Sequence, residues 1–200
     1  MRTGVLGGTF DPIHNAHIMV AEEAISSLDL AEVLFIPTAQ TPLKEDLPMS
    51  AVEHRVQMVR LAIADYPQFK LSTVEIDRPG TSYTVDTISE LRDKLGDENE
   101  LFFLVGWDSL SQLHRWREPA RIVKMCRLVA VPRPGYSLPD MDSLEKDVPG
   151  LSQKLILLNK PEIDISSTSI RERVARGLSI DQLVPPPVAD YIKQNRLYLS

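Results

Sequence analysis

Cysteine is almost absent from this sequence of 200 residues, which contains only Cys126. A single cysteine cannot form a disulfide within the chain, so the sequence is not that of a disulfide-rich secreted domain and fits a reducing compartment. Cys126 lies in the apolar stretch MCRLVAV, with no His or Lys directly beside it. We therefore expect a small buried hydrophobic side chain and not a reactive thiolate.

Long apolar runs are absent as well. No stretch approaches the roughly 18 apolar residues that a membrane-spanning helix needs. The N-terminal MRTGVLGGTF lacks the apolar core of a signal peptide. We therefore expect a cytoplasmic protein without a membrane partner.

Basic residues are in the minority, because 22 Lys and Arg stand against 28 Asp and Glu, for a net charge of −6 at pH 7. General nucleic-acid binders normally have a basic surplus, so we expect no nucleic-acid partner. An anionic ligand would have to be held by a few local cationic groups. The hydrophobic content of 43% is typical of a globular protein, which we expect to form one domain over residues 1–200.

Apolar segments of strand length alternate with amphipathic segments along the chain. Strands are predicted at 3–6, 32–36, 71–76, 101–105, 127–131 and 155–158, and helices from about 16, 50, 84 and 166. This alternation predicts βαβ units and an α/β fold, a Rossmann-like doubly wound parallel sheet. A small C-terminal helical part is expected at about 166–200. Residues 132–150, rich in Pro, Gly, Ser and Asp, are predicted to form a surface loop.

The stretch GGTFDPIHNAH, residues 7–17, follows the first predicted strand. Open α/β sheets bind ligands at such a strand-to-helix turn. Two glycines allow backbone N–H groups to approach an anion, and the following helix directs its positive end to the same place. His14 and His17 share one side of that helix. The pattern matches neither the GxGxxG fingerprint nor the P-loop.

Two other interpretations of this stretch stay open. Asp11-Pro12 could be a turn between a strand and a helix, with both histidines incidental. Zinc binding through HxxH is the weaker alternative, because zinc sites need three or four ligands and no cysteine lies nearby.

A second candidate stretch, DISSTSIRER, covers residues 164–173. Its hydroxyl side chains are typical of a helix start, and Ser169 with Glu172 has the spacing of a capping box, as Ser50 with Glu53 has in an earlier helix. Arg171 and Arg173 would project from the first turns of the helix that starts near Ser166. With the helix that follows the first motif, this makes two helix N-termini with cationic side chains in one small domain, which favours a polyphosphate ligand.

Together, GGTFDPIHNAH and ISSTSIRER resemble the bacterial nicotinate-nucleotide adenylyltransferases, within the nucleotidyltransferase superfamily that carries an (H/T)xGH signature. Further matching segments stand in the family's order: SYTVDT (82–87), GWDSL (106–110), HRW (114–116) and PRPGY (132–136). The resemblance therefore extends over the whole chain.

The resemblance implies an adenylyl transfer without a covalent enzyme intermediate. The 5′-phosphate of nicotinate mononucleotide would attack the α-phosphorus of ATP, giving deamido-NAD and pyrophosphate. Mg²⁺ bound with ATP is the implied cofactor, and no protein side chain is assigned to it. The protein would act by positioning and by charge neutralisation.

Matching positions give the implied site residues. The catalytic set is His14, His17 and Arg171, with His17 nearest the transferring phosphorus and Arg171 on the β- and γ-phosphates. The ATP-binding set is Gly7, Gly8, Thr9, Phe10, His14, His17, Lys44, Ser167, Thr168 and Arg171. The set for nicotinate mononucleotide is Tyr83, Thr84, Asp108, Trp116 and Arg133, with Trp116 stacked on the pyridine ring and Asp108 facing the ribose.

The chain departs from the family pattern at two positions. Ala16 stands where the family usually has Gly before its second His, and we expect a slightly wider approach to the phosphates without loss of activity. Leu43 stands where the family often has His before its lysine, which removes one phosphate contact.

Three alternative functions differ in what they require of the sequence. A sister enzyme for nicotinamide mononucleotide is not distinguished by sequence. An enzyme for phosphopantetheine would be shorter and usually has Thr in place of His14. An inactive nucleotide sensor would show damage in the catalytic set, which is intact. An oligomer is compatible with the sequence.

Overall fold

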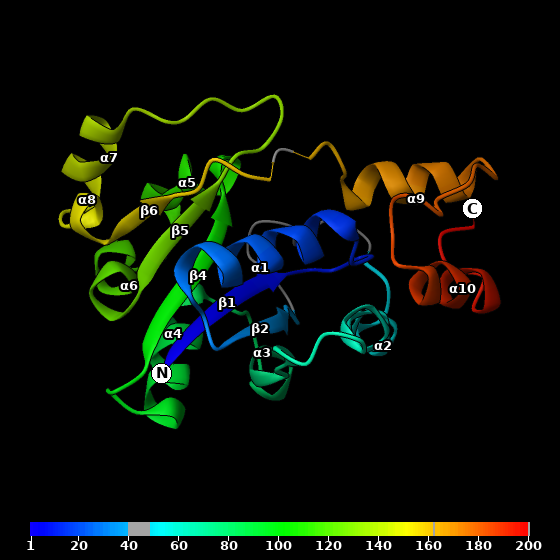
Figure 1. Cartoon of the computed structure of the whole chain (residues 1–200), viewed down its shortest axis with the longest axis horizontal. Helices are drawn as coiled ribbons and strands as arrows, with labels where there is room; N and C mark the ends of the chain where they lie inside the picture. The colour runs from blue at the N-terminus through cyan, green and yellow to red at the C-terminus, as the bar shows by residue number, and fades with distance from the viewer. Residues whose placement is uncertain (40–48, 162, 200) are drawn as a thin grey trace.

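In the computed structural model, six parallel strands form one sheet with helices on both of its faces (Figure 1). The structure describes residues 1–39, 49–161 and 163–199, and the counts that follow refer to these residues. The strands are β1 (Arg2–Gly8), β2 (Glu32–Pro37), β3 (Phe69–Leu71), β4 (Glu100–Gly106), β5 (Arg127–Val131) and β6 (Leu155–Leu157). Their order is β3-β2-β1-β4-β5-β6, and all neighbours are parallel. The predicted doubly wound sheet is confirmed.

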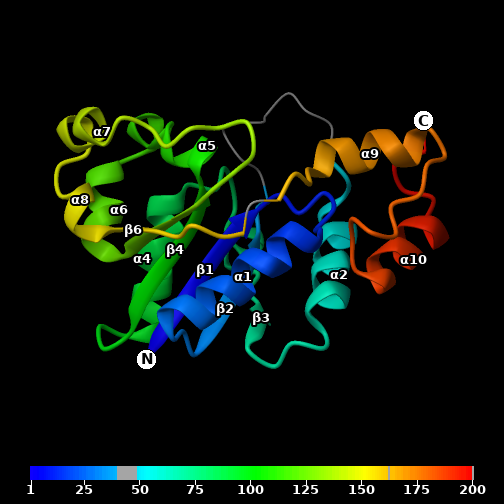
Figure 2. The ribbon, with the colours of Figure 1, turned by 45° about the horizontal axis from the view of Figure 1, so that its top comes forward.

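Helices connect the strands and extend beyond the sheet. They are α1 (Asn15–Leu28), α2 (Val52–Ile63), α3 (Val74–Asp77), α4 (Thr84–Leu95), α5 (Trp107–Leu110), η1 (Leu113–Arg115), α6 (Pro119–Met125), α7 (Met141–Asp147), α8 (Leu151–Lys154), α9 (Ser167–Ala175) and α10 (Pro186–Gln194). Figure 2 shows α9 and α10 beside α2, at the end of the molecule away from α7. Across the described ranges, no helix is long and apolar enough to cross a membrane.

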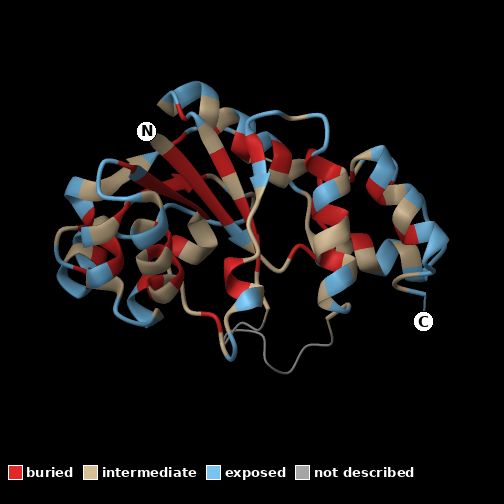
Figure 3. Ribbon diagram, turned by 90° about the horizontal axis from the view of Figure 1, so that it is seen from below, coloured by how far each residue is buried: buried red, intermediate tan, exposed pale blue. Residues whose placement is uncertain are grey.

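The central strand β4 is buried on both faces. Leu101, Phe103 and Val105 pack into the core cluster that contains α4 and α6. Phe102 and Leu104 point the other way, into the cluster that contains α1, α2, α9 and α10. Figure 3 shows strands of the sheet in red, the colour of buried residues. A parallel strand between two helical layers needs such an uninterrupted apolar run, which is why the sequence predicted it.

The strand predicted at 71–76 is wrong. Strand β3 ends at Leu71, and Val74–Asp77 forms helix α3. The Ile76 N–H donates to the Thr73 carbonyl (2.8 Å), and the Thr73 hydroxyl donates to the Asp77 carboxylate (2.7 Å). These local hydrogen bonds close a helical turn, although the side chains alternate as in a strand.

Both predicted capping boxes and the long loop are also wrong. Ala51 precedes α2 without a side-chain cap, and the backbone N–H of Ser50 donates instead to Asp11. The cap of α9 is Ser166, whose hydroxyl accepts from the Ser169 N–H (3.1 Å). The segment 132–150 contains α7, capped by Asp140, because Leu144 and Val148 are buried together in the core.

Gly4 in β1 is a crowded backbone position, packed against the side chains of Val33 and Leu30. A Cβ placed on Gly4 would lie 2.9 Å from Val33 Cγ2, whereas a Cβ on Gly7 would have its nearest neighbour 3.8 Å away. We expect Gly4→Ala to lower the free energy of unfolding by about 1–3 kcal/mol through overpacking. Gly7→Ala, in the same strand, is the control and should change it by less than about 1 kcal/mol. Urea denaturation measures both, and equal effects would contradict the crowding at Gly4.

Candidate active site

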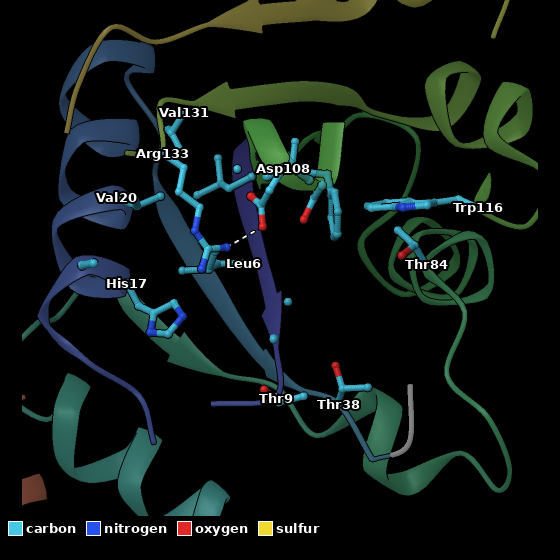
Figure 4. A pocket seen from close by; sticks show the side chains of 18 of the residues that line it. Leu6, Thr9, His17, Val20, Thr38, Thr84, Asp108, Trp116, Val131 and Arg133 are labelled. Carbon is cyan, nitrogen blue, oxygen red and sulfur yellow. Dashed lines mark hydrogen bonds and ion pairs between the residues drawn. The ribbon is translucent and has the colours of Figure 1, made fainter. Parts of the chain in front are cut away.

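A cavity of about 690 Å³ opens where the chain leaves the carboxyl ends of β1 and β4. These two neighbouring strands are the point at which the strand order reverses, the usual ligand site of doubly wound sheets. Its lining includes predicted residues from both sets: Gly7, Gly8, Thr9, His14, His17, Tyr83, Thr84, Asp108, Trp116 and Arg133. His17 and Trp116 lie at opposite sides, with Asp108 and Arg133 between them (Figure 4).

The loop after β1 is anchored by Phe10. Its φ of 48° places the backbone in the left-handed region, which is uncommon for a residue other than Gly. The ring is 1% exposed and packs against Phe35, and it meets the His17 ring edge-on with centroids 5.0 Å apart. The side chain of Phe10 therefore belongs to the core, which leaves only its backbone to face a ligand.

The two histidines of the first motif are stacked, with ring centroids 3.7 Å apart. The backbone N–H of His14 donates to Nδ1 of His17 (3.2 Å). Since Nδ1 accepts, the proton of the neutral His17 ring is on Nε2, which makes Nε2–H a hydrogen-bond donor. Helix α1 begins at Asn15, so both rings lie at its positive end.

His14 is neutral near pH 7. Its side chain is buried, and burial lowers its pKa from 6.5 to about 4, with the charge of Arg133 as a smaller cause. Its Nδ1 atom is buried without a hydrogen-bond partner. An anion in the cavity would favour the protonated form of His14, opposite to the effect of burial.

Helix α9 reaches the same loop from the other end of the chain. Arg171 donates through Nη1 to the Asp11 carbonyl (2.7 Å), and the Ser167 hydroxyl donates to the Pro12 carbonyl (2.9 Å). Thr168 accepts from Nη2 of Arg171 (3.4 Å). Arg171 and Ser167 thus contact the loop from outside the cavity lining, and Thr168 contacts Arg171. The other arginine of this motif, Arg173, donates to the Ser179 carbonyl, away from the loop.

The opposite side of the cavity is formed by α4 and its neighbours. Helix α4 begins at Thr84, as predicted, and its preceding residue Tyr83 gives no side-chain cap. Asp108 forms an ion pair with Arg133. Trp116 meets the ring of Phe103 edge-on, with centroids 6.0 Å apart. Tyr83 and Thr84 line the cavity, so the start of α4 borders the cavity and carries no side-chain cap.

Several cavity residues were missed by sequence reasoning. Glu75 and Ser82 are 7% exposed and line the cavity. Glu75 accepts from the Thr87 hydroxyl (2.8 Å), and burial raises its pKa. Glu75 was missed because its segment was interpreted as a strand. Arg115 and Arg117 also line the cavity, and the polar stretch HRWRE was the signal that could have identified them.

The remaining positions named in the sequence analysis differ in where they lie. Lys44 and Leu43 lie outside the residues that the structure describes. Ala16 lines the cavity in the first turn of α1. Cys126 is buried, as expected, and burial raises its pKa to about 12.

Comparisons with known proteins relate the chain to nucleotidyltransferases. The model of the family described as cytidylyltransferase-like matches residues 5–173. A protein of Dehalococcoides mccartyi (strain CBDB1), named probable nicotinate-nucleotide adenylyltransferase, is 50% identical over 99% of this chain and 97% of its own. A Roseiflexus protein (strain RS-1) of the same name is 48% identical over 98% and 96%. The solved structure of Plasmodium falciparum nicotinic acid mononucleotide adenylyltransferase complexed with NaAD has a TM-score of 0.81 at 22% identity, covering 98% and 97% of the two chains.

The lowered pKa of His14 predicts a loss of stability in acid. Between pH 6.5 and 4 the unfolded chain binds a proton at this residue that the folded protein does not, so the free energy of unfolding falls as pH falls. We expect the wild type to lose about 2 kcal/mol more than His14→Asn between pH 6.5 and 4.5.

Urea denaturation of both proteins at these pH values measures this difference. The exposed His114, changed to Asn, is the control for removing a histidine as such. Identical pH profiles for the wild type and His14→Asn would show that His14 does not resist protonation.

Proposed function

Because the chain belongs to the cytidylyltransferase-like family, and within it to the nicotinate-nucleotide adenylyltransferases, we propose that it joins the AMP of ATP to nicotinate mononucleotide, giving deamido-NAD and pyrophosphate in NAD biosynthesis. One observation carries this proposal. A single cavity is lined on one side by the two stacked histidines and on the other by the start of α4 and Trp116. Its volume suits a ligand the size of a dinucleotide.

The triphosphate is assigned to the side of the first motif. Gly7, Gly8 and Thr9 offer backbone groups there, and the positive end of α1 faces the same space. Nε2–H of His17 donates to a non-bridging oxygen of the α-phosphate, where negative charge gathers during transfer. A phosphate oxygen of the mononucleotide bonds to the α-phosphorus as the bond to the β-phosphate oxygen breaks. The nucleophile is already anionic, so this step needs no general base.

The leaving pyrophosphate is assigned to Arg171 and the start of α9. Arg171 donates one N–H to the Asp11 carbonyl and another to the Thr168 hydroxyl (3.4 Å). Since a guanidinium has five N–H donors, Arg171 can also donate to phosphate oxygens. Ser167 would contribute its backbone N–H at the helix start, since its hydroxyl already donates to the Pro12 carbonyl. Lys44 stays in the proposed set by its match to the family.

Mg²⁺ is proposed to enter with ATP. It prefers phosphate oxygens and water to an all-protein cage. Both oxygens of the Asp11 carboxylate are hydrogen-bonded, to Tyr198 and Ser50, whereas Asp108 is paired with Arg133 through Oδ2 alone. Among the described residues, no three His, Cys, Asp or Glu side chains group together to hold a metal ion. The residues present therefore fit an ion held by the phosphates, which would neutralise charge on the triphosphate.

The mononucleotide is assigned to the side of α4. Trp116 would stack on the pyridine ring, Tyr83 and Thr84 would present N–H groups to its carboxylate, and Asp108 would face the ribose. Arg133 lies beside Asp108 and keeps that carboxylate from repelling the ligand. We also propose that the reaction takes place in the cytoplasm.

The proposed function predicts a strong preference for nicotinate over nicotinamide mononucleotide. The N–H groups at the start of α4 are donors, so the NH₂ of an amide would leave buried donors unpaired at about 1–3 kcal/mol each. We expect kcat/KM for nicotinate mononucleotide to be higher by roughly 10²-fold or more.

Pyrophosphate release at saturating Mg-ATP, with each mononucleotide in turn, measures this preference. Equal values, or a preference for the amide, would mean that the start of α4 does not recognise the base. Absence of turnover with both would contradict the adenylyltransferase function.

His17 is proposed to stabilise charge on the transferring phosphoryl group. Its Nε2–H is oriented by the hydrogen bond that Nδ1 accepts from His14, so it is a preorganised donor. We expect His17→Ala to lower kcat on the order of 10²-fold or more. The KM for nicotinate mononucleotide should change little, because the base lies on the far side of the cavity. Steady-state kinetics test this, and a near-normal kcat would remove His17 from the catalytic set.

A further inference from the structure

The end of the chain returns to the first motif. The hydroxyl of Tyr198 donates to Oδ1 of Asp11 (2.7 Å), across 187 positions of sequence. Asp11 is 2% exposed, and its other oxygen, Oδ2, accepts from the backbone N–H of Ser50 (3.1 Å). In Figure 1 the chain ends beside α9 and α10. Among the described residues, Tyr198 therefore supplies one of the two hydrogen bonds to this buried carboxylate.

The segment that carries Tyr198 is held in an unfavourable backbone conformation. Arg196 and Tyr198 have φ values of 53° and 63°, in the left-handed region that residues other than Gly seldom adopt. The Leu197 N–H donates to the Ile192 carbonyl (3.0 Å), which ties the segment to α10. Burial and the contact with Asp11 both raise the pKa of Tyr198, so its hydroxyl stays protonated and remains a donor. The strain is balanced by contacts with the rest of the protein.

The same loop is fixed from its other side by Arg55. This side chain is 1% exposed, and its Nη1 donates to the carbonyls of Thr9 (2.8 Å) and Thr38 (2.7 Å). Its Nε donates to the Ser50 carbonyl (3.1 Å). The backbone at Thr9 and the carboxylate of Asp11 are thus held by two different side chains, and His14 follows three residues later.

We propose that Tyr198 is a positioning residue for the triphosphate side of the cavity. By holding Asp11 it fixes the loop Thr9–His14, and with it the two stacked histidines and the Asp11 carbonyl that orients Arg171. None of these contacts reaches the side of α4 and Trp116. This inference rests on the assignment of ATP to the first motif in the proposed function.

The chain offers a matched pair of tyrosines to test this role. Tyr198→Phe removes only the hydroxyl that binds Asp11 and keeps the ring, which packs against the core. Tyr191→Phe is the control, because the Tyr191 hydroxyl is hydrogen-bonded to Nδ1 of His54 (2.8 Å) and its ring packs against the same cluster. Both variants lose one tyrosine hydroxyl in the C-terminal helical part.

We expect Tyr198→Phe to raise the KM for ATP about tenfold, because the loop shifts when a buried acceptor loses its donor. The KM for nicotinate mononucleotide should stay within about twofold, and Tyr191→Phe should stay within about twofold for both substrates. A loss of folded molecules lowers kcat but changes neither KM, so a structural role alone cannot produce this split.

Three results would overturn the role of Tyr198. They are an unchanged KM for ATP, an equal rise of both KM values, and the same rise in Tyr191→Phe. If the wild type does not turn over with nicotinate mononucleotide, the proposed function fails. Calorimetric titration with Mg-ATP then tests Tyr198 separately, through a Kd that should be about tenfold higher in Tyr198→Phe than in Tyr191→Phe.

Discussion

The buried guanidinium of Arg55 is the contact on which the site depends most. It binds carbonyls that follow β1 and β2 and one that precedes α2, so three segments distant in sequence are fixed relative to one another. Burial lowers the pKa of Arg55, and Asp11 is the first of the groups that oppose this shift. Removing such a group would leave several buried carbonyls without donors and one buried carboxylate without its counter-charge. Helix packing positions the loop Thr9–His14, and the hydrogen bonds of the Arg55 guanidinium fix its conformation.

The topology of the sheet explains why two substrates can meet. Strand order reverses between β1 and β4, so the chain leaves these neighbouring strands toward opposite faces. Helix α1 lies on one face with the first motif, and α4 lies on the other. Their N-termini both open on the cavity between them. In the proposed function, each anionic group therefore has its own helix start, and the fold brings the reacting groups together.

Most of the sheet could be predicted, because a strand covered on both faces has to be apolar throughout, as at residues 101–105 and 127–131. The error at 71–76 arose where alternation is short and local hydrogen bonds from Thr73 decide the structure. The cavity lining could be predicted where its residues are contiguous in sequence, around His14 and His17. Arg55 and Tyr198 could not be found in this way, since an arginine in an amphipathic helix and a tyrosine near the chain end normally indicate solvent-exposed surface.

The electrostatics of the cavity follow from burial more than from net charge. The chain carries −6, and Arg133 in the cavity is paired with Asp108. His14 is neutral because burial opposes its protonation, and the hydrogen bond to Nδ1 fits the neutral Nε2–H form of His17. Neutral donors bind a ground-state phosphate less strongly than cations do, and a charge that increases during transfer strengthens their hydrogen bonds. In the proposed function, the two histidines would therefore bind the transition state more strongly than the ground state, while Arg115, Arg117 and Arg133 supply the positive charge of the cavity lining.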